Sequence, residues 1–135
     1  MDEEVLDRLL DAATEAAQHS YSPYSGFPVG AAVLTAGGNI YAGTNIENAS
    51  YGATVCAERV AIFKAVSEGE DKILALVVYT NAASYAFPCG MCLQVLSFSG
   101  DRPPPAPGKK NVREKILFFF EVKNTFLRQK NRTFL

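Results

Sequence analysis

The sequence predicts a single layered α/β domain in which helices pack against a mixed β-sheet. Its 135 residues fit one domain of ordinary size, and 48% hydrophobic residues suffice for a packed core. Segments with helical and with strand character also alternate along the chain. No apolar stretch approaches the roughly 20 residues of a membrane-spanning helix, and the acidic start at residues 1–4 is unlike a secretory signal. We therefore expect a cytoplasmic protein without a membrane segment.

The first part of the chain predicts a helix followed by a hairpin. Apolar residues recur at helical spacing over residues 3–19, with charged residues on the opposite face. Prolines and a glycine break this helix between residues 20 and 28. Small and branched residues predict strands over Val29–Thr35 and Ile40–Ile46, and the two glycines between them favour a tight turn.

The middle of the chain predicts a helix, a strand and a second helix. The first of these helices covers about residues 55–68, with Thr54 as its N-cap and Gly69 as its stop. Ile73–Thr80 is nearly all apolar, as expected of a central strand that is covered on both faces. A proline favours the start of a short helix over about residues 88–97.

Charge divides the chain into two unlike parts. The net charge is −7 over residues 1–100 and +6 over residues 101–135. We therefore expect an acidic core, residues 1–98, and a basic tail, residues 99–135, that completes or extends the same domain. Within the tail, only residues 115–122 predict a strand. Basic residues among phenylalanines can bind single-stranded nucleic acid, but a solvated edge strand with a loose end is the commoner meaning.

Three cysteines predict a metal site. Cys89 and Cys92 form a C-x-x-C motif that places both on one helical face, and Cys56 lies well before them. All three fall near predicted helix N-termini, where a thiol ionises more readily. Three thiolates on a tetrahedral zinc ion leave one position for water, which is typical of a catalytic rather than a structural site. Glu58 lies two residues after Cys56, close enough to move protons.

Each of these motifs also has an ordinary explanation. A C-x-x-C motif is typical of redox pairs and of half a structural zinc site, Cys56 fits a core cysteine, and Glu58 fits a solvated helix residue. Jointly, C-x-E at the start of one helix and P-C-x-x-C at the start of another match the signature of zinc deaminases. The combination favours a zinc hydrolase.

From about Leu6 to Leu96 the chain resembles the small, tetrameric cytidine deaminases of nucleoside salvage. Besides the zinc motifs, the segments Tyr21–Ala32, Asn45–Tyr51 and Gln94–Leu96 are similar to that family. The resemblance implies a three-layer α/β sandwich, one zinc ion per subunit and a homotetramer with shared active sites. It also implies hydrolytic deamination of cytidine and deoxycytidine to uridine and deoxyuridine plus ammonia, in pyrimidine salvage.

The resemblance assigns the catalytic and metal-binding roles. Cys56, Cys89 and Cys92 match the three zinc ligands. Glu58 matches the proton shuttle, which protonates ring nitrogen N3 and later passes a proton to the departing amino group. Arg59 matches an arginine that donates hydrogen bonds to the ligand sulfurs and so offsets their negative charge.

The resemblance also assigns the substrate contacts. Phe27 matches a wall of the base pocket, and Asn45 and Glu47 match residues that hydrogen-bond the ribose hydroxyl. The backbone N–H of Ala57 matches a contact to the base carbonyl. Tyr51 matches a residue offered across a subunit interface, which implies an oligomer.

Two features depart from the family pattern. Leu93 stands where the family has an arginine, which removes no group from the mechanism. The tail does not resemble the family's last strands and final helix, and neither Phe126 nor Phe134 aligns with the phenylalanine that closes the base pocket there. A catalytically impaired zinc protein and a deaminase of another cytosine nucleoside therefore stay open. Polynucleotide deaminases carry histidine at the Cys56 position, so the ligand set favours free nucleosides over nucleic acid.

Overall fold

The protein is described by a computed structural model that covers residues 2–81, 88–98, 117–122 and 125–129, with side chains described as far as Leu96. The elements follow one another in the order α1 (Glu3–Ala17), β1 (Val29–Thr35), β2 (Ile40–Thr44), the 3-10 helix η1 (Tyr51–Ala53), α2 (Ala57–Ser67), β3 (Ile73–Thr80), α3 (Gly90–Phe98), β4 (Leu117–Val122) and β5 (Thr125–Gln129). Among these residues, no helix is long and apolar enough to cross a membrane.

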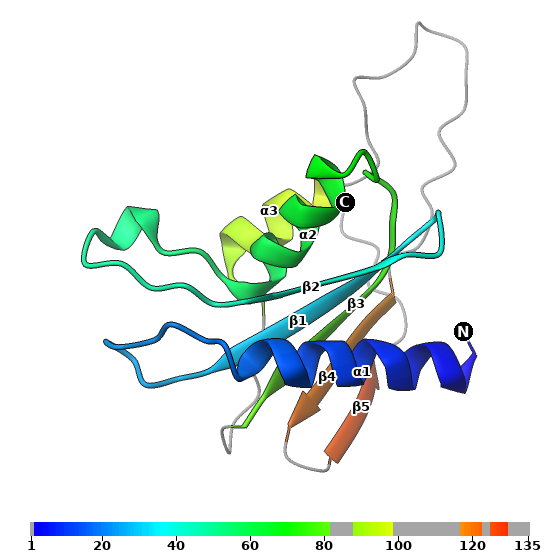
Figure 1. Ribbon diagram of the computed structural model, residues 1–135, viewed down its shortest axis with the longest axis horizontal. Coiled ribbons are helices and arrows are strands. Elements are labelled where there is room, and N and C mark those ends of the chain that lie inside the picture. Colours follow the sequence, from blue (N-terminus) through cyan, green and yellow to red (C-terminus); the bar gives the residue numbers. More distant parts are fainter. Residues whose placement is uncertain (1, 82–87, 99–116, 123–124, 130–135) are drawn as a thin grey trace, which may run out of the picture.

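The strands form one mixed sheet in the order β2-β1-β3-β4-β5. β1 pairs antiparallel with both β2 and β3, β3 pairs parallel with β4, and β4 pairs antiparallel with β5. Figure 1 looks toward the β2 edge of the sheet, with α1 below it and with α2 and α3 above it. The expected three-layer α/β sandwich with a mixed sheet is confirmed.

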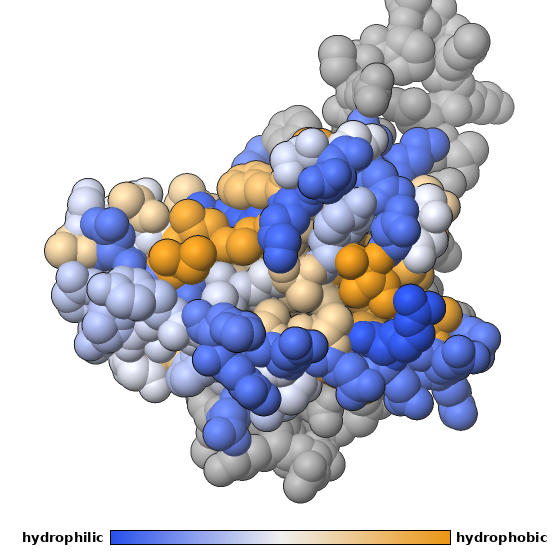
Figure 2. Space-filling view, viewed as in Figure 1, coloured by the Kyte–Doolittle hydropathy of each residue, from blue (hydrophilic) through white to orange (hydrophobic). Residues whose placement is uncertain are grey.

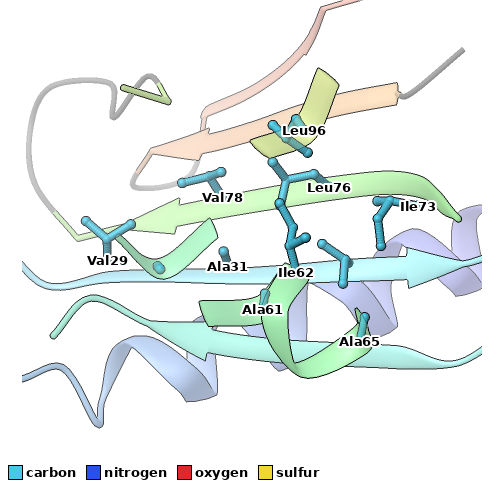
Figure 3. Close-up of a cluster of buried hydrophobic side chains, with 11 residues drawn as sticks. Val29, Ala31, Ala61, Ile62, Ala65, Ile73, Leu76, Val78 and Leu96 are labelled. Carbon is cyan, nitrogen blue, oxygen red and sulfur yellow. The ribbon is translucent and has the colours of Figure 1, made fainter. Parts of the chain in front are cut away.

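The sheet supports a hydrophobic core on each face. On one side, Ile62 of α2 and Leu96 of α3 pack against alternate residues of β1 and β3 (Figure 3). On the other side, Leu9 and Ala13 of α1 pack against the residues in between. Successive side chains of a strand point to opposite faces, so the nearly continuous apolar run of β3 serves both cores, as expected of a central strand.

The surface seen from the β2 edge has a hydrophilic part and a hydrophobic part. Figure 2 shows hydrophilic residues along the outer side of α1, and hydrophobic residues in the strip between α1 and α2, where β2 runs. Ile40 and Tyr41 of this edge strand are only half-buried. Phe63 and Val66, on the outer side of α2, are also exposed.

Several boundaries differ from the prediction. β1 and β3 have the predicted bounds, and Gly69, with a φ of 87°, ends α2 as predicted. The predicted N-cap of α2 is wrong: the N-cap is Cys56, and the Thr54 hydroxyl instead accepts the Asn48 N–H at 3.0 Å. β2 ends before Ile46, which forms isolated bridges outside the strand.

The tail contributes two strands, of which the sequence predicted one. The strand predicted at 115–122 corresponds to β4, whereas β5 was missed, because residues 123–135 have no alternating pattern. Both strands extend the same sheet as the core. Phe134 and the linker of the tail lie outside the described residues.

Candidate active site

The three cysteines meet where α2 and α3 begin. Cys56 is the N-cap of α2, Cys89 directly precedes α3, and Cys92 lies in the first turn of α3. The Leu93 N–H donates to the Cys89 carbonyl at 3.0 Å, which closes that turn. A helix start presents unpaired N–H groups and the positive end of the helix dipole, and both favour thiolates.

The spacing of the sulfur atoms fits a tetrahedral zinc ion. The Sγ atom of Cys89 lies 3.7 Å from that of Cys56 and 3.4 Å from that of Cys92, and all three lie within 4.8 Å of one another. Thiolates bound at about 2.3 Å in tetrahedral geometry lie about 3.8 Å apart. The cluster is therefore spaced for one zinc ion per chain with little rearrangement, and three protein ligands leave a fourth position.

Arg59 contacts this cluster from the first turn of α2. Its Nη2 donates to Cys56 Sγ at 3.6 Å and to the Thr54 carbonyl at 3.3 Å, and the residue is buried. Hydrogen bonds from Cys92, Arg59 and Cys89 outweigh burial and lower the pKa of Cys56 to about 5. The hydrogen bond to Cys56, together with burial, raises the pKa of Cys92. The site thus stabilises the thiolate of Cys56, and zinc binding requires its cysteine ligands in that deprotonated form.

Glu58 is a buried carboxyl beside the cysteines. Its side chain is only 4% exposed. Burial raises its pKa to about 7, and the negative charge of Cys56 adds to this effect, while a hydrogen bond from its own backbone N–H opposes it. A carboxyl group with such a pKa can accept and release a proton near neutral pH.

Asn45 lies in a second group of polar residues, after β2. Its Oδ1 accepts hydrogen bonds from the Ser20 hydroxyl at 2.6 Å and from the Val29 N–H at 3.0 Å. Its Nδ2 donates to the Phe27 carbonyl at 2.8 Å. The loop that contains Phe27 is therefore attached to Asn45, and the Phe27 side chain packs partly buried against the core below α2 and α3.

Glu47 holds the same loop at another point. Its Oε1 accepts the backbone N–H groups of Tyr24 at 3.0 Å and of Ser25 at 3.1 Å. Hydrogen bonds from Ser25, and then from Tyr24, lower the pKa of Glu47. Glu47 is thus an ionised acceptor at neutral pH.

Backbone pairing joins this polar group to the cysteine site. Ile46 exchanges two hydrogen bonds of 2.9 Å with Val55, the residue before Cys56, and also bridges to Tyr21. The segment that contains Asn45 and Glu47 therefore runs beside the start of α2. There, Ala57 is buried, and its N–H lies at a position that has no acceptor within the helix.

Tyr51 is placed differently from the other predicted residues. It opens η1, and its side chain is 91% exposed. The structure therefore brings together five of the predicted residues: Cys56, Cys89, Cys92, Glu58 and Arg59. Phe27, Asn45 and Glu47 lie in two neighbouring loops, residues 18–28 and 45–50, which we call the loop pair. The Tyr51 side chain points away from the described chain.

Sequence reasoning missed the residues that support the loop pair. Ser20, Tyr24 and Ser25 contact Asn45 or Glu47 through a hydroxyl or backbone N–H groups. A serine in a polar loop has no periodicity or motif spacing, and a backbone donor has no residue signature. The proline and glycine pattern marked this segment as a structured turn. The family resemblance of Tyr21–Ala32 included Tyr24 and Ser25 but assigned them no role.

Known proteins with similar sequences are cytidine deaminases. Residues 3–103 match the family model described as the cytidine and deoxycytidylate deaminase zinc-binding region. The chain is 46% identical over 95 residues to a probable cytidine deaminase of Dictyostelium discoideum, a match that covers 70% of the chain and 65% of that protein. It is 48% identical over 94 residues to the cytidine deaminase of Halalkalibacterium halodurans, covering 68% and 71%.

Solved structures agree with this assignment. The crystal structure of cytidine deaminase from Burkholderia pseudomallei matches with a TM-score of 0.73 and 31% identity, covering 90% of this chain and 91% of that one. Cytidine deaminase from Mycobacterium tuberculosis matches with a TM-score of 0.67 and 34% identity, covering 91% and 89%. With its three-cysteine cluster spaced for zinc, the chain belongs to the cytidine and deoxycytidylate deaminase family.

Proposed function

We propose that this protein catalyses the zinc-dependent hydrolysis of cytidine and deoxycytidine to uridine and deoxyuridine plus ammonia. The observation that carries the proposal is the buried carboxyl of Glu58, two residues from Cys56, at a cluster of three thiols spaced for one zinc ion. Membership of the deaminase family supports the same reaction. A non-catalytic zinc protein has no need of a buried carboxyl at this position.

Glu58 moves the protons of the reaction. Zinc, when bound by Cys56, Cys89 and Cys92, supplies the Lewis acid that activates water at neutral pH. Glu58 takes a proton from the attacking water and delivers it to N3 while C4 is attacked. It then passes the remaining proton to the amino group, which leaves as ammonia. One carboxyl serves both steps because it regains its starting state within each cycle.

The neighbouring loop pair binds the nucleoside. Phe27 forms a wall for the base, Asn45 and Glu47 bind a ribose hydroxyl, and the Ala57 N–H donates to the base carbonyl. The hydrogen bonds that tie Asn45 and Glu47 to the loop before β1 support this role, because a site held before the substrate arrives costs less to order on binding.

Arg59 tunes the metal site without touching the substrate. Three thiolates make a strongly negative ligand set, which would render the attacking water less acidic. The guanidinium next to Cys56 offsets part of that charge.

We further propose a homotetramer with shared active sites, acting in pyrimidine salvage in the cytosol. The 91% exposure of Tyr51, and the exposed Phe63 and Val66 on α2, support contacts with further copies of the chain. Thiol ligands persist most readily in a reducing compartment.

The proposal is tested by the loss of cytidine absorbance in the ultraviolet. With zinc-loaded protein, we expect Glu58→Gln to lower kcat by about 10²–10⁴-fold, the usual contribution of a general acid–base group. Glu68→Gln changes a second glutamate at the other end of α2 and should leave kcat unchanged. Both variants should bind one zinc ion per chain, measured by elemental analysis.

Two outcomes would contradict the proposal. If wild-type protein binds one zinc ion per chain but leaves cytidine and deoxycytidine intact, the enzyme hypothesis fails in favour of a zinc-stabilised protein. If it instead deaminates only another cytosine nucleoside, the proposed substrate is wrong.

A further inference from the structure

The Ser20 hydroxyl donates its hydrogen to Asn45. Ser20 Oγ lies 2.6 Å from Asn45 Oδ1 and 3.0 Å from Ser22 Oγ. A hydroxyl has one hydrogen, and an amide oxygen can only accept. The hydrogen of Ser20 is therefore used toward Asn45, and the contact between the two serines uses the hydrogen of Ser22.

This bond completes the acceptor capacity of the Asn45 side chain. An amide oxygen has two lone pairs. Those of Asn45 Oδ1 accept the Ser20 hydroxyl and the Val29 N–H. The Thr44 hydroxyl lies 3.5 Å away, at the limit of hydrogen-bond distance. The opposite amide orientation would set Oδ1 against the Phe27 carbonyl and Nδ2 against the Val29 N–H. The network thus permits one orientation only.

One hydrogen of the Asn45 amide remains for a ligand. Nδ2 carries two hydrogens, and within the described residues only the Phe27 carbonyl accepts one of them. Asn45 can therefore contact a ligand only as a donor. Glu47, with its lowered pKa, can contact a ligand only as an acceptor. A donor beside an acceptor matches a hydroxyl group, which offers both functions.

We propose that Ser20 is a positioning residue, which holds the Asn45 amide as a dedicated donor to a ribose hydroxyl of the nucleoside. This inference rests on the proposed function and adds to it a residue that does not itself touch the substrate. Without the Ser20 hydroxyl, one lone pair of Oδ1 is open to water, and the amide is held less firmly. The sugar hydroxyl is then bound less well, while the chemistry at Glu58 is unaffected.

The test compares substrates with and without sugar hydroxyls. With zinc-loaded protein, we expect Ser20→Ala to raise KM for cytidine and deoxycytidine about three- to tenfold, as the loss of one hydrogen bond does, with kcat little changed. KM for 2′,3′-dideoxycytidine, which lacks both ring hydroxyls, should stay the same. Ser20→Thr keeps the hydroxyl and should keep the wild-type values. Ser67→Ala removes a hydroxyl at the far end of α2 as a matched control.

A binding measurement supplies a readout that needs no turnover. In calorimetry, Ser20→Ala should weaken uridine binding by a similar factor and leave 2′,3′-dideoxyuridine binding unchanged. An equal shift for both ligands would mean that Ser20 only supports the loop, and no shift for either would mean that it plays no part. Both results overturn the inference, whereas inactivity of the wild-type protein toward cytidine overturns the proposed function instead.

Discussion

Glu70 accepts hydrogen bonds from three side chains at the closed end of the β1–β2 hairpin. Its carboxylate accepts hydrogen bonds from the Tyr41 hydroxyl at 2.7 Å, from the Asn39 amide at 3.0 and 3.1 Å, and from the Thr35 hydroxyl at 3.1 Å. The bond from Tyr41, followed by those from Asn39 and Thr35, lowers the pKa of Glu70. The same bond raises the pKa of Tyr41 to about 12. The ionised Glu70, which follows α2, thus stabilises the closed end of the hairpin through these hydrogen bonds.

The hydrogen bonds to the Glu70 carboxylate predict that the stability of the protein depends on pH. The pKa of Glu70 in the folded protein lies below the ordinary 4.5. The contribution of its carboxylate to the free energy of unfolding is therefore complete above about pH 4.5, and it is lost as the pH falls through the folded-state pKa. Glu70→Gln should therefore be less stable than wild type at pH 7, and the difference should shrink in acid. Urea unfolding midpoints from pH 7 to pH 3 check this.

Glu15→Gln, on the exposed side of α1, is the matched control for charge removal. Acid also protonates the zinc thiolates, but equally in both proteins, so the comparison isolates Glu70. A stability difference that is constant across the pH range would contradict the prediction.

At the scale of elements, two glycines let helices approach the sheet. A Cβ atom on Gly30 of β1 would lie 1.8 Å from the Ala13 carbonyl oxygen of α1, and one on Gly43 of β2 would lie 2.6 Å from the Ala61 nitrogen of α2. Backbone atoms cannot turn aside as a flexible side chain can. The close approach on each face therefore depends on the absence of a side chain.

This close packing predicts that one added methyl group at Gly30 strongly destabilises the protein. Gly30→Ala should lower the free energy of unfolding by at least about 3 kcal/mol, the upper end of ordinary overpacking, because α1 must shift as a unit. Chemical denaturation measures the change. Gly52→Ala is the control, since a Cβ there meets no atom within 4 Å. Similar losses in both variants would show that the approach of α1 is not the cause.

At the scale of the whole molecule, the proposed sharing of active sites can be tested by mixing variants. If Tyr51 completes a neighbour's site, a subunit with Tyr51→Ala still offers an intact Glu58, and a subunit with Glu58→Gln still offers Tyr51. Mixed assemblies then contain sites with both residues.

We expect each variant alone to have low activity, and a mixture that is dissociated and reassembled to exceed the average of the two. Cytidine turnover before and after reassembly, with sedimentation to follow the assembly, measures this. Simple mixing without dissociation is the control. Activity that never exceeds the average would contradict shared sites.

Local patterns sufficed for most elements and for the metal site. The bounds of β1 and β3 follow from runs of small and branched residues, and the zinc cluster follows from two short motifs at helix starts. Neighbours in sequence form each run and each motif, whereas the approach of Cys56 to Cys89, 33 residues later, is a tertiary contact. The cap of α2 could not be predicted in this way, because Thr54 has a competing partner in Asn48 that only the folded loop brings near. β5 was missed for a similar reason, since its strand conformation is tied to pairing with β4 rather than to its own pattern.

The sequence by itself indicated the layered fold, the three cysteines that form a cluster spaced for zinc, and a glutamate two residues from one of them. Tertiary structure alone decided that Glu58 is buried, and hence that its pKa rises to about 7, because burial depends on elements distant in sequence. It also decided that Ser20 and Asn45, 25 residues apart, share a hydrogen bond. Motifs specify which groups are available, whereas packing sets their solvation and partners, and these determine what the groups can do.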